Sequence, residues 1–173
     1  MSGDQSELLR NELQWLQQVS ETSINSSRQH FIRFELPVTY RRLLSAGISH
    51  EYSMGYGSIN GFRASVATSF YWYDLKNDEP TKLMVHPFCF MDANAYYEQK
   101  LSPEMALKEL QHYLEVVHAV HGQMITIWHN SFLGTDAAFE GWKEIYQLFI
   151  AQVTKVQKQT TPGFEKRASV QTG

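Results

Sequence analysis

The chain has 173 residues, of which 13% are aromatic, with 18 acidic side chains against 15 basic ones and a formal net charge of -3. This aromatic content excludes a chain that is disordered throughout, and the length suits a single domain with a sizeable core. The charge balance excludes a protein that holds nucleic acid through a basic surface. The single cysteine, Cys89, excludes an intrachain disulfide and a cysteine-based zinc cage.

Targeting and membrane-spanning segments are not evident in the sequence. The polar start of the chain lacks the basic and apolar regions of a secretory signal, and no apolar run approaches the ~20 residues that span a bilayer. We therefore expect a soluble, cytoplasmic protein with neither a membrane nor a nucleic acid as a partner. The sequence does not indicate an oligomeric state.

The first half of the chain alternates helical and extended patterns. It predicts a helix over 6–19, a loop over 21–27, a strand over 28–36, a helix over 37–46 and a strand over 48–54. Leu9, Leu13 and Leu16 recur at helical spacing in the first of these segments. Pro37 suits the start of the second helix and Gly47 its end, because proline needs no N–H partner there and glycine takes a positive φ without strain.

The second half predicts further strands and two long helices. In order, these are an extended segment over 66–75, a turn over 76–81, a strand over 82–91, a helix over 103–121, a strand over 124–128, a helix over 137–156 and a polar, flexible tail over 157–173. Pro87 interrupts its strand, which is typical of an edge or a bulge. Ser102, Pro103 and Glu104 supply a cap, a first-turn proline and a first-turn acid, and Gly122 ends that helix.

This order of elements predicts an α/β fold with a largely parallel sheet, in which ligands meet the carboxyl ends of the strands. Polar residues lie at or beside four predicted strands, at 27–30, 51–53, 92–94 and 128–130. Any single one of these segments is explained equally well as a loop anchor or a helix cap. The four together, one for each strand, favour a functional site.

The remaining histidines and the cysteine are weaker candidates. His118 and His121 are spaced to form a metal clip, but a solvated helix face is the simpler interpretation. His86, which lies within a predicted strand, is expected to be buried with one hydrogen bond, and His50 to be exposed. Cys89, between two phenylalanines, is expected to be a buried structural thiol.

Five segments, at 27–34, 51–56, 61–64, 86–92 and 127–130, combine into a specific pattern. Together they resemble bacterial polysaccharide deacetylase-like proteins, the NodB-homology group of carbohydrate esterases, in a divergent branch. The resemblance covers roughly residues 7–150. It implies a distorted (β/α) barrel, a divalent metal held by an aspartate and two histidines, and hydrolysis of acetyl groups on sugars.

The resemblance assigns three catalytic residues. Arg28 matches an arginine that holds the catalytic base in place, Glu51 lies near the position of an acid that is usually aspartate, and His129 matches the general acid that protonates the leaving group. Four further residues of these segments are expected to contact the substrate: Asp92, Arg63, Trp128 and His30. We expect Arg28, Glu51 and His129 to meet at neighbouring strand ends, with Arg28 and Glu51 paired and Asp92 close by.

Residues 1–29 carry no counterpart of the family's two acids on the first strand, nor of its paired metal-binding histidines. We therefore expect residues 1–156 to form the C-terminal part of a deacetylase-like domain, an incomplete (β/α) barrel with no metal or other cofactor in this chain. A divalent metal, zinc, is expected in a complete parent protein. A fragment, a mis-started gene and a degenerate relative all fit this sequence.

Three functions fit these observations. The first is a metal-dependent sugar deacetylase, and in that case this chain is expected to be inactive by itself. The second is a non-catalytic carbohydrate-binding or interaction remnant of the same fold, and the third is an unrelated α/β protein with a helical surface for a partner. A carbohydrate is the expected ligand in the first two cases.

Overall fold

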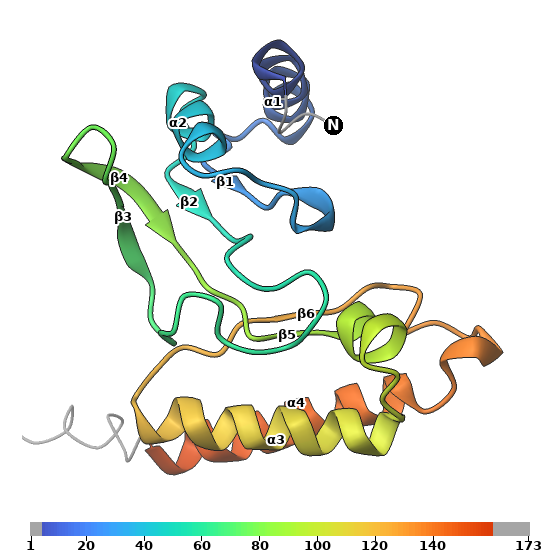
Figure 1. Cartoon of the computed structure of the whole chain (residues 1–173). Coiled ribbons are helices and arrows are strands. Elements are labelled where there is room, and N and C mark those ends of the chain that lie inside the picture. Colours follow the sequence, from blue (N-terminus) through green and yellow to red (C-terminus); the bar gives the residue numbers. More distant parts are fainter. Residues whose placement is uncertain (1–4, 161–173) are drawn as a thin grey trace, which may run out of the picture.

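The computed structural model describes residues 5–160, in which helices, short strands and turns alternate (Figure 1). The elements, in chain order, are α1 (Ser6–Ser20), β1 (Ser26–Ser27), η2 (His30–Ile32), α2 (Val38–Ser45), β2 (His50–Glu51), β3 (Phe70–Asp74), β4 (Glu79–Val85), β5 (Phe90–Met91), η3 (Asn94–Glu98), α3 (Pro103–Ala119), β6 (Thr126–Ile127), η4 (Ala137–Phe139) and α4 (Trp142–Thr160). The short turns η2 and η4 are 3-10 helical, and η3 is a π-helix. None of the described helices is long and apolar enough to cross a membrane.

Four strands form a mixed sheet in the order β1-β2-β4-β3. The strands β1, β2 and β4 are parallel, whereas β3 is antiparallel to β4 and precedes it in a hairpin. The strands β5 and β6 form a second, two-stranded parallel sheet. The fold is therefore α/β with mostly parallel strands, as predicted, and within the described residues these strands do not close into a barrel.

Two separate hydrophobic cores stabilise the fold. The first, called here the sheet core, lies between the four-stranded sheet and the helices α1 and α2 (Figure 1), and its buried residues are Leu9, Tyr40, Leu43, Ile48, Met54, Leu83 and Val85. The second, the helix core, packs β5 and the loop after β6 against α3 and α4, and its largest fully buried side chains are Phe90, Leu110, Phe132 and Trp142. A third, small group, the joining cluster, consists of Phe88, Met91 and Ile127.

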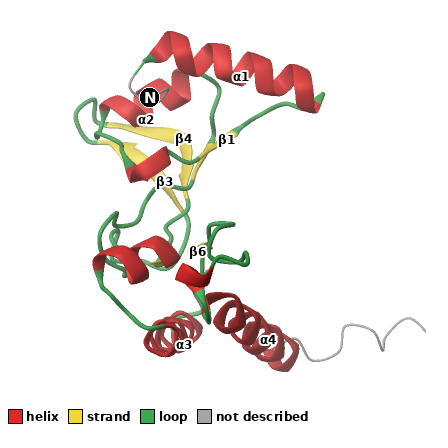
Figure 2. Ribbon diagram, turned by 90° about the vertical axis from the view of Figure 1, so that its right-hand side faces the viewer, coloured by secondary structure: helices red, strands yellow, loops and turns green. Residues whose placement is uncertain are grey.

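Helices α3 and α4 pack side by side and form the base of the helix core (Figure 2). Helix α3 begins as the sequence predicts, because the Ser102 hydroxyl accepts a hydrogen bond from the Met105 backbone N–H and Pro103 occupies the first turn. Leu110 faces inward from α3 and is completely buried. Burial of one leucine side chain contributes roughly 1.5–3 kcal/mol, so Leu110 helps to hold the helix in place.

The predicted strand over 28–36 is wrong. Strand β1 lies earlier, within the segment predicted as a loop, and its two serines pair with His50–Glu51 of β2. The chain then forms the turn η2, in which Phe31 and Ile32 have φ angles of 59° and 55°. The apolar residues of this segment pack into different places, Ile32 against the joining cluster and Phe34 against the sheet core. They therefore do not form one buried strand.

Other boundaries also differ from the prediction, and β4 begins at Glu79, inside the predicted turn over 76–81. The strand over 82–91 divides into β4 and β5, which belong to different sheets, because the chain passes between them around Pro87, which has no N–H to donate to a sheet. The last helix begins at Trp142, after the separate turn η4. It continues to Thr160, so the first residues of the predicted tail over 157–173 are helical. The rest of that tail lies outside the described residues.

Candidate functional site

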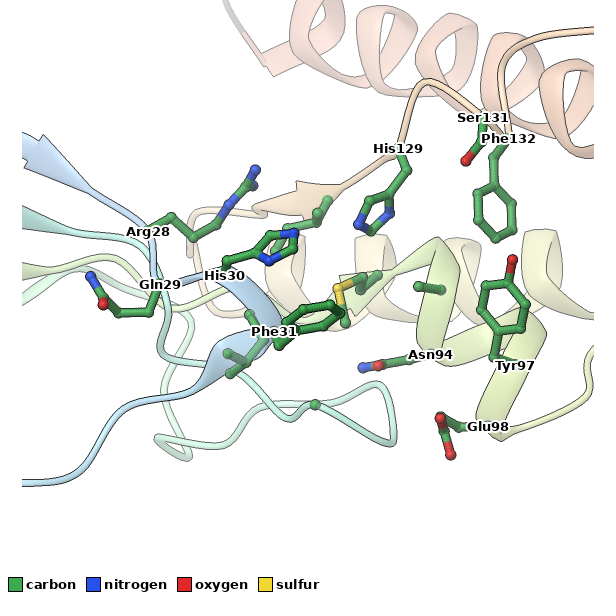
Figure 3. A pocket seen from close by; sticks show the side chains of 15 residues that line it. Arg28, Gln29, His30, Phe31, Asn94, Tyr97, Glu98, His129, Ser131 and Phe132 are labelled. Carbon is green, nitrogen blue, oxygen red and sulfur yellow. The ribbon is translucent and has the colours of Figure 1, made fainter. Parts of the chain in front are cut away.

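A pocket of about 650 Å³ opens beside the carboxyl ends of β5 and β6 (Figure 3). Its walls come mainly from three parts of the chain: the segment 28–32 after β1, the turn η3, and the loop after β6 that carries His129 and Phe132. A volume of this size suits a small molecule or part of a larger one. The pocket therefore combines one wall from the sheet side of the molecule with two walls from the helix side.

A buried aspartate holds a histidine at this pocket. Asp92 directly follows β5 and His129 comes two residues after β6, and the pairing of Met91 with Ile127 brings these two strand ends together. The Asp92 carboxylate accepts hydrogen bonds from the backbone N–H and from Nδ1 of His129, both at 2.6 Å. The Asp92 side chain is completely buried, whereas 44% of the His129 side chain is exposed.

The contact with Asp92 determines which nitrogen of His129 faces a ligand. An ionised carboxylate only accepts hydrogen bonds, so Nδ1 carries the hydrogen and Nε2 is the nitrogen left to exchange a proton. The Ala93 backbone N–H donates a further hydrogen bond to the same carboxylate. Burial raises the pKa of Asp92, and the hydrogen bonds from His129 oppose that rise. The donors from His129 and Ala93 thus favour the ionised form of the aspartate.

The segment after β1 presents Arg28, His30 and Phe31 to the pocket (Figure 3). Its anchor is Gln29, which is buried and whose backbone N–H donates to the Ser53 hydroxyl at 2.7 Å. Arg28 and His30 are exposed. Within residues 5–160 the Arg28 guanidinium has no hydrogen bond or ion pair, so its donors remain open to a ligand.

Glu51 does not line the pocket. Its Oε2 accepts a hydrogen bond from the Tyr40 hydroxyl at 2.8 Å, and its Oε1 accepts one from the Ser53 backbone N–H at 2.7 Å. The side chain is completely buried, and burial raises its pKa while these hydrogen bonds oppose the rise. The expected pair between Arg28 and Glu51 is absent from the described contacts, because Tyr40 and Ser53 hold the carboxylate inside the fold.

Arg63 and Trp128 also lie outside the pocket lining. The Arg63 guanidinium donates to the backbone carbonyl of Gly55 at 3.1 Å and stands over the ring of Phe34, 4.6 Å from its centroid. Trp128 packs against the helix core, and its Nε1–H donates to the Thr126 hydroxyl at 3.2 Å. Structural contacts therefore account for the positions of both side chains.

The turn η3 supplies pocket residues that the sequence does not single out. Tyr97 and Glu98 are exposed and line the pocket, and Asn94 lines it from the start of the turn. The Asn94 amide also donates to two backbone carbonyls of the loop at 56–59. The polar segment at 92–94 is a sequence signal for Asn94, but nothing in the sequence distinguishes Tyr97 from a core aromatic residue.

A pair of neighbouring histidines lies outside the pocket. His50 Nδ1 is 2.9 Å from His86 Nε2, and His86 Nδ1 is 2.7 Å from the Ser69 hydroxyl, which donates to Gln123 Oε1. Because the Ser69 hydroxyl donates its hydrogen to Gln123, His86 donates to Ser69 through Nδ1, and one of the two histidines donates across the contact between His50 Nδ1 and His86 Nε2. Burial and the neighbouring His50 lower the pKa of His86. His50 is half-buried and bonded, contrary to the predicted exposure.

The described residues do not fit a zinc centre. Within residues 5–160, no three His, Cys, Asp or Glu side chains converge, and a zinc site needs at least three protein ligands. Asp92 and His129 are two such groups, and they bond to each other. Cys89 is buried, as expected, and burial raises the pKa of its thiol to about 12.

Comparisons with known proteins add no assignment. No protein-family model matches the chain, and no curated protein or solved structure matches it. The functional argument therefore depends on the pocket: its Asp92–His129 pair, its unpaired Arg28 and its aromatic walls.

Proposed function

We propose that the pocket binds acetylated sugars and that His129 is the proton donor of a polysaccharide deacetylase-like site. The observation that carries this proposal is the hydrogen bond from His129 Nδ1 to the buried Asp92 carboxylate, which leaves Nε2 for a ligand in the pocket. A carboxylate behind a histidine holds the imidazole in one tautomer for acid–base chemistry. The resemblance of the segments at 27–34, 86–92 and 127–130 to deacetylase-like proteins supports the same function.

Deacetylation requires such a proton donor. When water adds to the acetyl carbonyl carbon and the C–N bond then breaks, acetate is released and the departing sugar nitrogen takes up a proton. Protonated His129 gives that proton from Nε2, while Asp92 holds the ring through Nδ1. The Arg28 guanidinium, which also lines the pocket, donates to sugar or acetyl oxygens. None of the described residues is assigned to the activation of the water.

A second candidate is carbohydrate binding without catalysis. Two aromatic side chains favour it, because Phe31 is 74% exposed, Tyr97 is 49% exposed, and both line the pocket. Exposed rings of this kind offer apolar surface to the C–H faces of sugars. The two candidates share the ligand and differ in whether acetate is released.

The first experiment titrates the full chain with three tetrasaccharides: the N-acetylglucosamine tetramer, its deacetylated counterpart, and cellotetraose, which has no nitrogen. Calorimetry gives the affinities, and ¹H–¹⁵N NMR follows His129 Nε2. We expect the acetylated tetramer to bind about fivefold more tightly than cellotetraose, since one added hydrogen bond contributes roughly 1 kcal/mol. We also expect it to shift the Nε2 resonance. Equal affinities for these two sugars contradict the proposed ligand class.

Acetate release then separates the two candidates. If His129 is the general acid, acetate released from the acetylated tetramer should fall by about 100-fold in His129→Gln, because general acid catalysis contributes that much or more. The matched control is His112→Gln, which changes an exposed histidine on α3 outside the pocket lining. A chain that binds the acetylated tetramer but releases acetate no faster than His129→Gln leaves binding without catalysis as the function.

A further inference from the structure

The turn η2 holds two consecutive residues in a left-handed backbone conformation. The φ angle is 59° at Phe31 and 55° at Ile32. Residues with a Cβ atom rarely adopt this region, and bulky or β-branched residues are the least suited to it. Phe and Ile in these positions therefore lower the stability of the fold. Backbone strain of this kind is concentrated at functional sites.

Contacts before and within the turn hold it in this conformation. Before the turn, the buried Gln29 donates its backbone N–H to the Ser53 hydroxyl at 2.7 Å. Within it, the Ile32 N–H donates to the Gln29 carbonyl at 3.1 Å, and the Ile32 side chain packs against the joining cluster. These contacts fix the shape of the turn, and none of them uses the Phe31 ring.

The Phe31 ring gains little burial from its position. It is 74% exposed and lines the pocket, and it lies beside the ring of His30 with the two centroids 4.1 Å apart. Figure 3 shows His30 and Phe31 extending toward the space that His129 and Tyr97 border. A phenylalanine left in solvent on a strained backbone is doubly unfavourable for folding. A ligand that covers the ring explains both observations.

We propose that Phe31 is a platform on which one pyranose ring of the ligand stacks, with the acetamido group directed toward His129. The C–H face of a pyranose is apolar and matches the face of an exposed aromatic ring in size and character. Tyr97, which is 49% exposed, offers a second aromatic surface from η3. The inference rests on the proposed function for the acetamido sugar and adds the residue that recognises the sugar ring.

Two substitutions separate the ring from the backbone. Phe31→Ala removes the ring and keeps a Cβ atom in the left-handed conformation, whereas Phe31→Gly removes both the ring and the strain. We expect both variants to bind the N-acetylglucosamine tetramer about tenfold more weakly, and Phe31→Tyr to bind it normally. Phe31→Gly should also raise the unfolding temperature by about 2–4 °C. A functional residue is thus identified by stability and affinity changing in opposite directions.

Two control variants lie outside the pocket lining. Ser65 also has a positive φ, 56°, so Ser65→Gly should raise the unfolding temperature without changing the affinity. Tyr71 on β3 is 63% exposed, so Tyr71→Ala removes an exposed aromatic ring from another surface and should leave the affinity unchanged.

The outcomes distinguish this inference from the proposed function. If Phe31→Ala binds the acetylated tetramer as tightly as the wild-type chain, the platform is refuted and the role of His129 is unaffected. A lower unfolding temperature in Phe31→Ala also refutes the platform, because the ring is then part of the packing. If Phe31→Ala weakens the acetylated tetramer and cellotetraose while the wild-type chain binds both equally, the platform stands and the proposed function fails. A wild-type chain that binds none of the three tetrasaccharides overturns both.

Discussion

Tyr40→Phe removes one hydroxyl group from the sheet core and tests what the buried Glu51 does. The Tyr40 O–H donates to Glu51 Oε2 at 2.8 Å, and both side chains are completely buried. Phenylalanine keeps the aromatic ring and its edge contact with Trp72, so no cavity forms. The substitution therefore isolates one hydrogen bond to a buried carboxylate.

The expected loss of unfolding free energy follows from that geometry. A hydrogen bond to a charged group contributes about 1.5–3 kcal/mol, and its loss leaves Oε2 buried without this donor. We expect Tyr40→Phe to lower the free energy of unfolding at neutral pH by about 2 kcal/mol. This is a large share of the roughly 5–15 kcal/mol that stabilises a natural domain. The Ser53 N–H still donates to Oε1, so the variant should remain folded.

Glu51→Gln should change stability in the opposite direction. The amide accepts from the Ser53 N–H through its oxygen and donates to the Tyr40 oxygen through its nitrogen, so each contact keeps a hydrogen bond, with the direction of the bond to Tyr40 reversed. Burial raises the pKa of Glu51 above its usual 4.5. Ionisation of the glutamate therefore destabilises the fold progressively as the pH rises from the unfolded pKa through the folded pKa, whereas the amide does not ionise. Glu51→Gln should raise the free energy of unfolding at neutral pH and leave it nearly unchanged below pH 4.5.

Urea denaturation followed by tryptophan fluorescence measures both variants at the two pH values. Calorimetric titration with the N-acetylglucosamine tetramer is the second measurement, and the affinity should be unchanged in both variants because Glu51 does not line the pocket. A Tyr40→Phe variant as stable as the wild-type chain refutes the reasoning about the hydrogen bond. A folded Glu51→Gln variant that no longer binds the sugar refutes the structural role given to Glu51.

Two further predictions concern other parts of the fold. Since burial and His50 lower the pKa of His86 below 6.5, stability should be constant above that pH and decline as the pH falls below it, because the unfolded chain takes up the proton more readily. Urea midpoints at a series of pH values should show the decline in the wild-type chain and a weaker one in His86→Asn; parallel declines would rule out His86 as the titrating group. Gly55→Ala should lower the free energy of unfolding by about 1–3 kcal/mol, because a Cβ atom there overlaps the buried Phe88 ring. An unchanged urea midpoint would show that the ring moves aside freely.

Local signals made the helices predictable, whereas the strands depend on distant partners. Ser102 and Pro103 mark the start of α3 within its own sequence, and the structure confirms that start. Strand β1 consists of two serines whose pairing with β2 has no local signature. The turn η2 was predicted as a strand because its apolar residues resemble one. Without a glycine, nothing in the sequence indicates a positive φ at Phe31.

The sequence likewise predicts some residues of the candidate site and not others. Asp92 and His129 follow paired parallel strands, and strand order alone indicates that such positions meet. Glu51 ends its strand in the same manner, but its carboxylate is held by Tyr40, and one sequence does not reveal whether a strand-end side chain turns outward or into a core. Tyr97 carries no signal, because a π-helix interrupts the ordinary helical spacing that pattern analysis detects.

The two separate cores have a consequence for how the protein opens. In the absence of a ligand, we expect each core to unfold locally, because the two cores have no buried residue in common, and amide hydrogen exchange should then report two protection levels. The pocket takes its walls from both sides, the segment 28–32 from one and His129 from the other. A molecule bound across them must be released before either side opens. At a concentration 100 times its Kd, this adds about 2.7 kcal/mol to both opening reactions. Occupancy of the pocket would thereby convert two independently exchanging halves into one cooperative unit.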